Sequence, residues 1–158
     1  MAVDVFLKLG DIKGESKDSK HPGEIDVLSW SWGVAQTGTM SVGGGGGAGK
    51  ASFSDLSFMH GVDKASPVLM KACATGEHIK EATLTARKAG KGQQDYLIVK
   101  MKEILITSVQ PSGSSEHPVE SVSMQCSHVD LEYKPQKADG SLEAGIHFKY
   151  DIKANKEG

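Results

Sequence analysis

The sequence predicts a mainly β fold: a compact β-barrel of two bent antiparallel sheets, with one short α-helix and a long Gly-rich loop. Apolar and polar residues alternate in several segments, as they do in strands with one buried face. Residues 66–76 alone carry both the start and the stop signals of a helix. Residues 37–50 include five consecutive glycines, a composition too flexible to form a regular element.

Length and composition describe one domain that spans residues 1–158. The chain is 38% apolar and 24% charged, and its formal net charge is -2. Its lysines are interleaved with acidic residues, so no broad attraction to nucleic acid or anionic lipid is expected. The longest apolar runs are far shorter than the ~20 residues of a membrane-spanning helix. The N-terminus has no basic leader, which predicts a chain without a signal peptide that begins in the cytoplasm.

Two segments show the strand pattern most clearly. In residues 3–9 the apolar side chains occupy every second position, which predicts a half-buried strand. Residues 146–153 alternate in the same way and place four apolar residues on one side (Ile146, Phe148, Tyr150 and Ile152). Residues 78–90, 95–110 and 119–133 also have the composition of strands.

A further strand is predicted in residues 24–33, EIDVLSWSWG, which contain both tryptophans of the chain. Strict alternation predicts two faces, one with Leu28, Trp30 and Trp32 and the other with Val27, Ser29 and Ser31. We expect Trp30 and Trp32 to lie in the core or at a subunit interface. Small hydroxyl side chains suit a surface that water covers, so Ser29 and Ser31 are candidates for a solvent-lined wall.

The apolar positions change phase within two of the predicted strands. They are even before Ser127 and odd after His128, and a bulge at this point would restore a common apolar face. A similar shift lies near Glu103 and Ile104. Because bulges bend sheets, the pattern favours a barrel or a strongly bent sandwich over a flat open sheet.

The predicted helix begins at Ser66, whose hydroxyl could cap the free amide groups of the first turn. Pro67 suits the first turn, and Gly76 can end the helix in a left-handed conformation. Leu69 and Cys73 lie on the apolar side of this segment. We therefore expect a short helix that packs on the sheets.

No cofactor or metal site is expected. Residues 44–50 match the GxxxxGK part of a phosphate-binding loop, but Ala51 stands where that loop needs Ser or Thr. Residues 51–58 then alternate like a strand, although the motif requires a helix there. The six histidines are scattered, without the spacing of metal ligands.

The sequence also predicts that the protein is not an enzyme. No serine lies in a GxSxG elbow. Cys73 and Cys126 both lie in apolar patterns, which is typical of structural thiols, although a disulfide between them stays open. Because distant residues can converge in a fold, an enzyme of unknown type remains a third alternative.

Five segments taken together resemble the haemolysin-coregulated protein (Hcp) family of bacterial type VI secretion. They are FLKLGDIKGESKDSKHPGEIDVLSWSWG, GGGGGAGK, DLSFMHGVDKASPVLMKAC, HIKEATLTARKAG and VDLEYKPQKADGS. They follow in order along essentially the whole chain, without a large insertion. The resemblance is therefore more specific than any single motif.

The resemblance implies a structural subunit of the type VI secretion inner tube. Hexameric rings would stack into a hollow tube whose lumen carries and protects small effector proteins, with Ser29 and Ser31 as candidates for the lumen wall. The implied partners are other copies of the chain, small effector proteins, and the secretion sheath and spike-tip proteins. The protein would lie in the bacterial cytoplasm before firing and would then be secreted.

The glycine-rich loop is the predicted site of contact between stacked rings, because its length and flexibility let it reach a neighbour. The candidate residues are Gly43, Gly44, Gly45, Gly46, Gly47 and Lys50. The alternative to a tube subunit is a secreted carrier or effector that binds a ligand without forming a tube. The mass of the assembled protein separates the two.

Overall fold

The computed structural model describes residues 3–38, 50–88 and 93–158. In order along the chain, the elements of these residues are β1 (Val3–Leu9), β2 (Ile25–Val27), β3 (Ser29–Ser31), β4 (Val34–Ala35), β5 (Ser52–Phe53), β6 (Leu56–Gly61), α1 (Ala65–Thr75), β7 (His78–Lys88), β8 (Asp95–Ser112), β9 (Val119–Gln125), β10 (His128–Tyr133), β11 (Ile146–Asp151) and β12 (Lys156–Glu157). Ten strands share one continuous sheet, and β4 and β5 form a separate pair. Every strand pairing is antiparallel.

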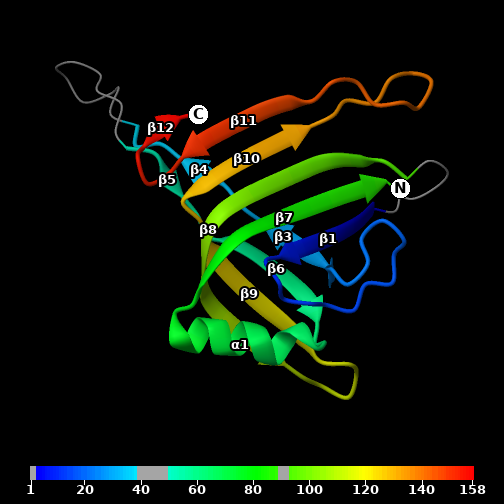
Figure 1. The fold of residues 1–158 in the computed structure, drawn as a ribbon, viewed down its shortest axis with the longest axis vertical. Helices are drawn as coiled ribbons and strands as arrows, with labels where there is room; N and C mark the ends of the chain where they lie inside the picture. Colours follow the sequence, from blue (N-terminus) through cyan, green and yellow to red (C-terminus); the bar gives the residue numbers. More distant parts are fainter. Residues whose placement is uncertain (1–2, 39–49, 89–92) are drawn as a thin grey trace.

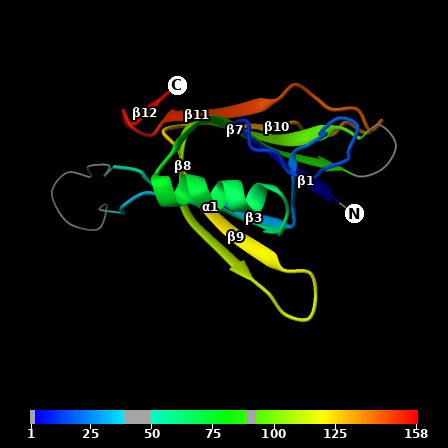
Figure 2. The ribbon, with the colours of Figure 1, turned by 60° about the horizontal axis from the view of Figure 1, so that its bottom comes forward.

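The long strand β8 divides the continuous sheet into two parts. Its first half pairs with β10 over residues 97–102, and its second half pairs with β9 over residues 105–112. The large part has the order β12-β11-β10-β8-β7-β1-β2, and the small part consists of β3, β6, β9 and the second half of β8 (Figure 1). Figure 2 shows β9 leaving the plane of the large part.

The bend in β8 lies at Glu103, where φ is 55°. Before it Met101 is buried, and after it Ile104 is buried, so the apolar positions change from one parity to the other. The phase change predicted near Glu103 and Ile104 is therefore confirmed. Because of this bend, both parts of the sheet direct apolar side chains into one core.

A second change of partner strand occurs at Leu28, between β2 and β3. Val27 pairs with β1, whereas Ser29 pairs with Met59 of β6. The N–H group of Leu28 donates a hydrogen bond of 2.7 Å to the carbonyl oxygen of Met59, and the Leu28 side chain is 66% exposed. The prediction that Leu28 shares a face with the tryptophans is wrong, and Val27 is buried instead, because strict alternation ends where the chain changes partners.

The prediction of a mainly β fold with two bent antiparallel sheets and one short helix is confirmed. The described strands do not form a closed ladder, because β2 and β3 follow each other along the chain without pairing. A bulge predicted near Ser127 and His128 is instead a break between two strands: β9 ends at Gln125 and β10 begins at His128. The phase changes there because β9 and β10 pair with different halves of β8.

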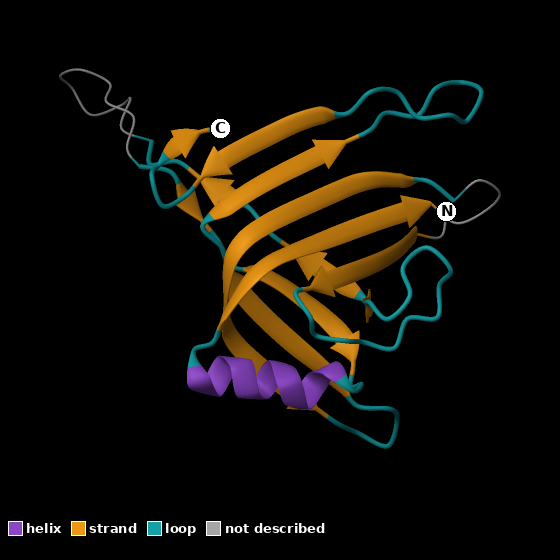
Figure 3. Cartoon of the chain, in the orientation of Figure 1, coloured by secondary structure: helices purple, strands orange, loops and turns teal. Residues whose placement is uncertain are grey.

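Helix α1 packs against β8 and buries its apolar side in the core (Figure 3). The helix ends as predicted: Gly76 has φ 68°, and the N–H of Glu77 donates to the carbonyl oxygen of Ala72 at 3.0 Å. The predicted cap at Ser66 is wrong, because the helix already begins at Ala65. The carboxylate of Asp63 accepts the N–H of Ala65 at 2.8 Å, and the Ser66 hydroxyl accepts the N–H of Asp63 at 3.1 Å.

An ion pair between a buried arginine and a half-buried aspartate fastens the loop of residues 10–24 to the large part of the sheet. Both Nη atoms of Arg87, a residue 1% exposed, donate to the carboxylate of Asp18 at 2.8 and 2.6 Å. These hydrogen bonds hold the pKa of Asp18 well below its ordinary value. The guanidinium carbon of Arg87 also lies 4.9 Å from the ring centre of Phe6. Together these contacts hold the loop against β1 and β7.

The apolar side of β11 is only partly covered. Tyr150 is half-buried, but exposure rises along the strand to 37% at Phe148 and 67% at Ile146. On the neighbouring β10, Tyr133 pairs with Ile146 and is also exposed. The strand predicted at residues 146–153 is confirmed over Ile146–Asp151, yet its apolar face extends beyond the core.

No helix of the described residues is long and apolar enough to cross a membrane.

Substitutions of two adjacent residues of β6 test which side of the small part of the sheet faces the core. Phe58 is fully buried and Met59 is exposed. We expect Phe58→Ala to lower the free energy of unfolding by about 3 to 5 kcal/mol, because it opens a cavity in the core. Met59→Ala should change it by less than about 0.5 kcal/mol. Urea unfolding followed by circular dichroism measures both, and equal losses would contradict the assigned faces.

Candidate functional site

The small part of the sheet presents a face of mainly small polar side chains, which we call the serine face. The opposite side of the same strands packs on the core through residues such as Phe58, Val122 and Met124. The serine face consists of Ser29, Ser31, Ser57, Met59, Gly61, Leu105, Ser108, Gln110, Ser112, Val119, Ser121, Ser123 and Gln125, as the pairing registers show. It contains both candidate residues for a solvent-lined wall, Ser29 and Ser31, and both are exposed.

Strand register places the serines of this face in rows. Ser31 pairs with Ser57, Ser57 pairs with Ser123, and Ser123 pairs with Ser108, so one row crosses all four strands. The hydroxyl oxygens of Ser57 and Ser123 lie 3.1 Å apart, at hydrogen-bond distance. In the next row Met59 lies between Ser29 and Ser121 and is 38% exposed.

The strand residues of the serine face carry no ionisable side chain: they offer hydroxyl groups, amides, one exposed thioether and the apolar side chains of Leu105 and Val119. The nearest acid–base pair in sequence faces the core: Nε2 of His60 lies 2.8 Å from Oε1 of Glu120, and both residues are fully buried. Asp55 directly precedes β6 on the parity of Ser57, so its half-buried carboxylate borders the serine face, and it accepts a hydrogen bond of 2.7 Å from the Thr107 hydroxyl. A serine becomes a nucleophile only when a base activates it. The face is therefore suited to hydration and weak hydrogen bonding.

Trp30 and Trp32 lie away from the serine face. Trp30 occupies the other side of β3, where it is half-buried against the core. Trp32 follows β3 and stacks on Phe53, with ring centres 5.8 Å apart. Both positions agree with the predicted packing role, and whether either tryptophan also contacts a second subunit stays a prediction.

The short pair β4–β5 carries the two ends of the glycine-rich segment. Phe53 of β5 packs against Tyr150 and Phe148 of β11, with ring centres 5.2 and 6.5 Å apart. This aromatic cluster fixes β5 to the edge of the large part of the sheet. The described residues do not include Gly43, Gly44, Gly45, Gly46 or Gly47. Lys50, the first described residue after them, is exposed. The stacking role of this segment stays a prediction.

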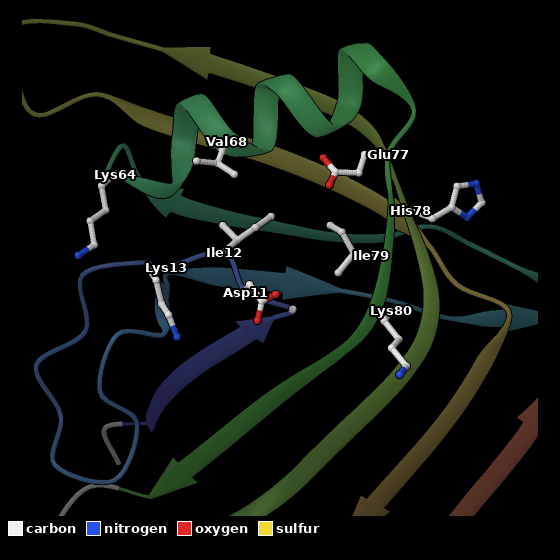
Figure 4. Close-up of a pocket in the computed structure, with 10 residues that line it drawn as sticks. Asp11, Ile12, Lys13, Lys64, Val68, Glu77, His78, Ile79 and Lys80 are labelled. Atoms are coloured by element: carbon white, nitrogen blue, oxygen red, sulfur yellow. The ribbon is translucent and has the colours of Figure 1, made fainter.

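A surface pocket of about 650 Å³ lies between α1 and the residues that follow β1 (Figure 4). Its apolar lining includes Ile12, Val68 and Ile79, and its charged lining includes Asp11, Glu77 and three lysines (Lys13, Lys64 and Lys80). In Figure 4 the lysine side chains extend in different directions. Because its charged groups do not converge on one point, we do not assign chemistry to this pocket.

Comparison with protein families identifies the family to which the chain belongs. The model of the family described as type VI secretion system effector, Hcp, matches residues 6–133. The chain belongs to the Hcp family. The resemblance predicted from the sequence is thus confirmed, and Hcp proteins are secreted components of the type VI system.

Individual Hcp proteins agree with this assignment in sequence and in structure. Protein hcp1 of Pseudomonas aeruginosa is 50% identical over 159 residues, which cover 98% of each chain. The crystal structure of Hcp1 from Salmonella typhimurium superimposes with a TM-score of 0.83 at 42% identity over 99% of each chain. A type VI secretion system effector from Yersinia pestis gives a TM-score of 0.78 at 37% identity, over 94% of this chain and 100% of the other.

Sequence reasoning found two residues of the serine face and missed the rest. Buried and partly exposed residues alternate along β6 and β9, so Ser57, Ser121 and Ser123 each lie between two buried residues. This alternation is visible in the sequence and could have predicted that these serines face away from the core. The rows were not predictable, because they depend on the register between strands far apart in the chain.

Cysteine labelling tests which residues the serine face exposes. We expect Ser31→Cys to react rapidly with a small maleimide, whereas Val122→Cys, at a fully buried position, should react only after unfolding. The wild-type protein gives the background of Cys73 and Cys126, both free and half-buried; burial raises the pKa of the Cys126 thiol to about 11. Equal rates for the two new cysteines, measured by mass spectrometry, would contradict the assignment.

Proposed function

We propose that this Hcp protein is a structural subunit of the type VI secretion inner tube, in which hexameric rings stack and the serine faces line the lumen. The observation that carries the proposal is a partly exposed sheet face whose strand residues carry no ionisable side chain, in a domain whose opposite sheet face forms the core. Such a face suits the wall of a water-filled channel. Small effector proteins would travel inside, and the sheath and spike-tip proteins would be the other partners.

Exposed apolar residues support self-association. Tyr133, Ile146 and Phe148 continue the apolar side of β10 and β11 beyond the core. Aromatic and aliphatic residues of this kind are frequent at the buried centres of subunit interfaces. In a ring, each copy would present this edge to a different surface of the next copy, as head-to-tail symmetry requires.

The rest of the proposal concerns the path of the protein and its chemistry. The protein would assemble in the bacterial cytoplasm and leave the cell with its cargo when the machine fires. It would act without catalysis, as a conduit and a carrier. Its main alternative is a secreted carrier that binds a ligand as a monomer, and the serine face would then be a ligand surface.

Ring formation is tested by the mass and shape of the purified protein. We expect a hexamer by light scattering at micromolar concentration and rings by electron microscopy. Ile146→Glu should shift the mass toward the monomer, because a charge would be buried in the interface. Val68→Glu, at an exposed position of α1, is the matched control and should leave the hexamer intact. A wild-type monomer at every concentration would favour the carrier.

Ring stacking is tested separately by shortening the glycine-rich segment. Deletion of residues 43–47 should leave single rings and their melting temperature unchanged, because it removes none of the buried core residues of the described strands and helix. Long tubes should become rarer in electron micrographs, and secretion should fall. Deletion of Lys156 and Glu157, the short terminal strand β12, provides a control for a change elsewhere on the surface. Normal tubes and normal secretion after the loop deletion would contradict the stacking role.

A further inference from the structure

A serine, a histidine and an aspartate meet where β9 ends and β10 begins. The hydroxyl oxygen of Ser127 lies 3.1 Å from Nδ1 of His128, and Nε2 of His128 lies 3.0 Å from a carboxylate oxygen of Asp151 on β11. All three residues are half-buried. Of the hydrogen-bonded hydroxyl groups among the described residues, only that of Ser127 faces an imidazole.

The other paired histidines are engaged differently. Three of them each lie within 3.7 Å of two carboxylates (His21, His60 and His147). Nε2 of His117 lies 2.9 Å from the carbonyl oxygen of Val62. Within the described part of the chain, His128 is thus the histidine that joins a hydroxyl group to a carboxylate.

Backbone hydrogen bonds hold Ser127 in place on two sides. Its N–H group donates to the carbonyl oxygen of Lys102 at 3.0 Å, and its carbonyl oxygen accepts the N–H of Ile152 at 2.7 Å. The hydroxyl group has two acceptors within reach, Nδ1 of His128 at 3.1 Å and the carbonyl oxygen of Lys102 at 3.3 Å. The side chain is therefore fixed between β8 and β11, with the imidazole as its nearer acceptor.

The carboxylate of Asp151 determines which nitrogen of His128 is free to accept a proton. A neutral imidazole has one N–H group, and an ionised carboxylate can only accept, so the proton lies on Nε2 opposite Asp151. The N–H of Ala154, which donates to Asp151 at 2.9 Å, lowers the pKa of this carboxyl group and keeps it ionised. Nδ1 is left with its lone pair toward the Ser127 hydroxyl. The connectivity is that of a Ser–His–Asp triad with the roles of the two ring nitrogens exchanged.

Ser127 and His128 line a surface pocket of about 520 Å³, which leaves room for a small molecule beside the hydroxyl group. The apolar part of its lining includes Leu105, Cys126 and Ile152. Burial raises the pKa of the Cys126 thiol to about 11, so this neighbouring sulfur stays protonated near neutral pH and is a poor competitor as a nucleophile. The pocket is thus suited to a compact, partly apolar group held next to the serine.

We propose that Ser127 is a site of covalent acylation, at which activated esters with a small acyl group transfer that group to the serine hydroxyl. His128 acts as the general base, and Asp151 is a positioning residue that fixes the tautomer of the imidazole. The inference is independent of ring formation.

The transfer needs no reactant besides the ester. The hydroxyl oxygen of Ser127 attacks the carbonyl carbon of the ester while the hydroxyl proton passes to Nδ1 of His128. The bond between the carbonyl carbon and the leaving oxygen then breaks, and the leaving group departs as an alcoholate or phenolate. The acyl group remains on Ser127 as an ester, and the imidazolium releases its proton to water. Each subunit takes up one acyl group, so the site is a place of modification and requires no turnover.

Acetylation of the purified protein by p-nitrophenyl acetate tests the site, with peptide mapping by mass spectrometry to give the rate at each hydroxyl group. We expect Ser127 to be acetylated at least about tenfold faster than Ser141, whose hydroxyl donates to the carboxylate of Asp139 at 2.6 Å. Ser141→Ala is the matched control and should leave the rate at Ser127 unchanged. Acetylation of Ser127 no faster than that of Ser141 overturns the proposal.

Two variants separate activation of the serine from access to the pocket. His128→Gln should lower the rate at Ser127 at least about tenfold, because it removes the base. Asp151→Asn should also lower this rate, because the imidazole is no longer held in one tautomer. Acetylation of the exposed amine of Lys153, which lines the same pocket, should stay the same in both variants. An unchanged rate at Ser127 in His128→Gln contradicts the inference.

A measurement on the wild-type protein decides the question even if a variant does not fold. In urea Ser127 and His128 remain neighbours in the chain, but Asp151 and the pocket are no longer beside them. The advantage of Ser127 over Ser141 should therefore fall when the protein unfolds. If the full advantage persists in urea, chain adjacency alone activates the serine and the proposed site is wrong. Light scattering reports assembly separately, so a wild-type monomer that is acetylated at Ser127 would contradict the tube proposal and leave this inference intact.

Discussion

The architecture depends on one strand that belongs to two sheets. β8 pairs with β10 before Glu103 and with β9 after Ile104, while its pairing with β7 runs through to Leu105, and the bend at Glu103 turns the sheet. This turn lets both parts direct apolar residues into the same space, which α1 helps to cover. Without it, the alternating strands would form one flat surface with much of its apolar side in water.

The same turn creates a second face from the strands of the small part. Because side chains alternate across a strand, every core residue of β6 and β9 places its neighbour on the outside. Three of these outside residues are serines (Ser57, Ser121 and Ser123), and register aligns Ser57 with Ser31 and Ser123 with Ser108. Core packing and the proposed lumen wall are thus two sides of the same hydrogen-bonded ladder.

Sequence patterns predicted what depends on neighbours in the chain. They identified the strands, the helix end at Gly76 and the phase change at Glu103. They failed at Leu28 and at Ser127, where the chain changes partners, because no local signal specifies which strand pairs with which. The rows of the serine face were inaccessible for the same reason, since they join residues brought together only by folding.

A wall of hydroxyl groups has a consequence for whatever moves along it. Hydroxyls bind water and one another but carry no net charge, so the serine face itself neither attracts nor repels a molecule according to its isoelectric point. Dissolved salt has no charge on the strand residues of this face to screen. A passage lined in this way discriminates by diameter more than by charge, and acidic and basic proteins would slide through it with similar friction.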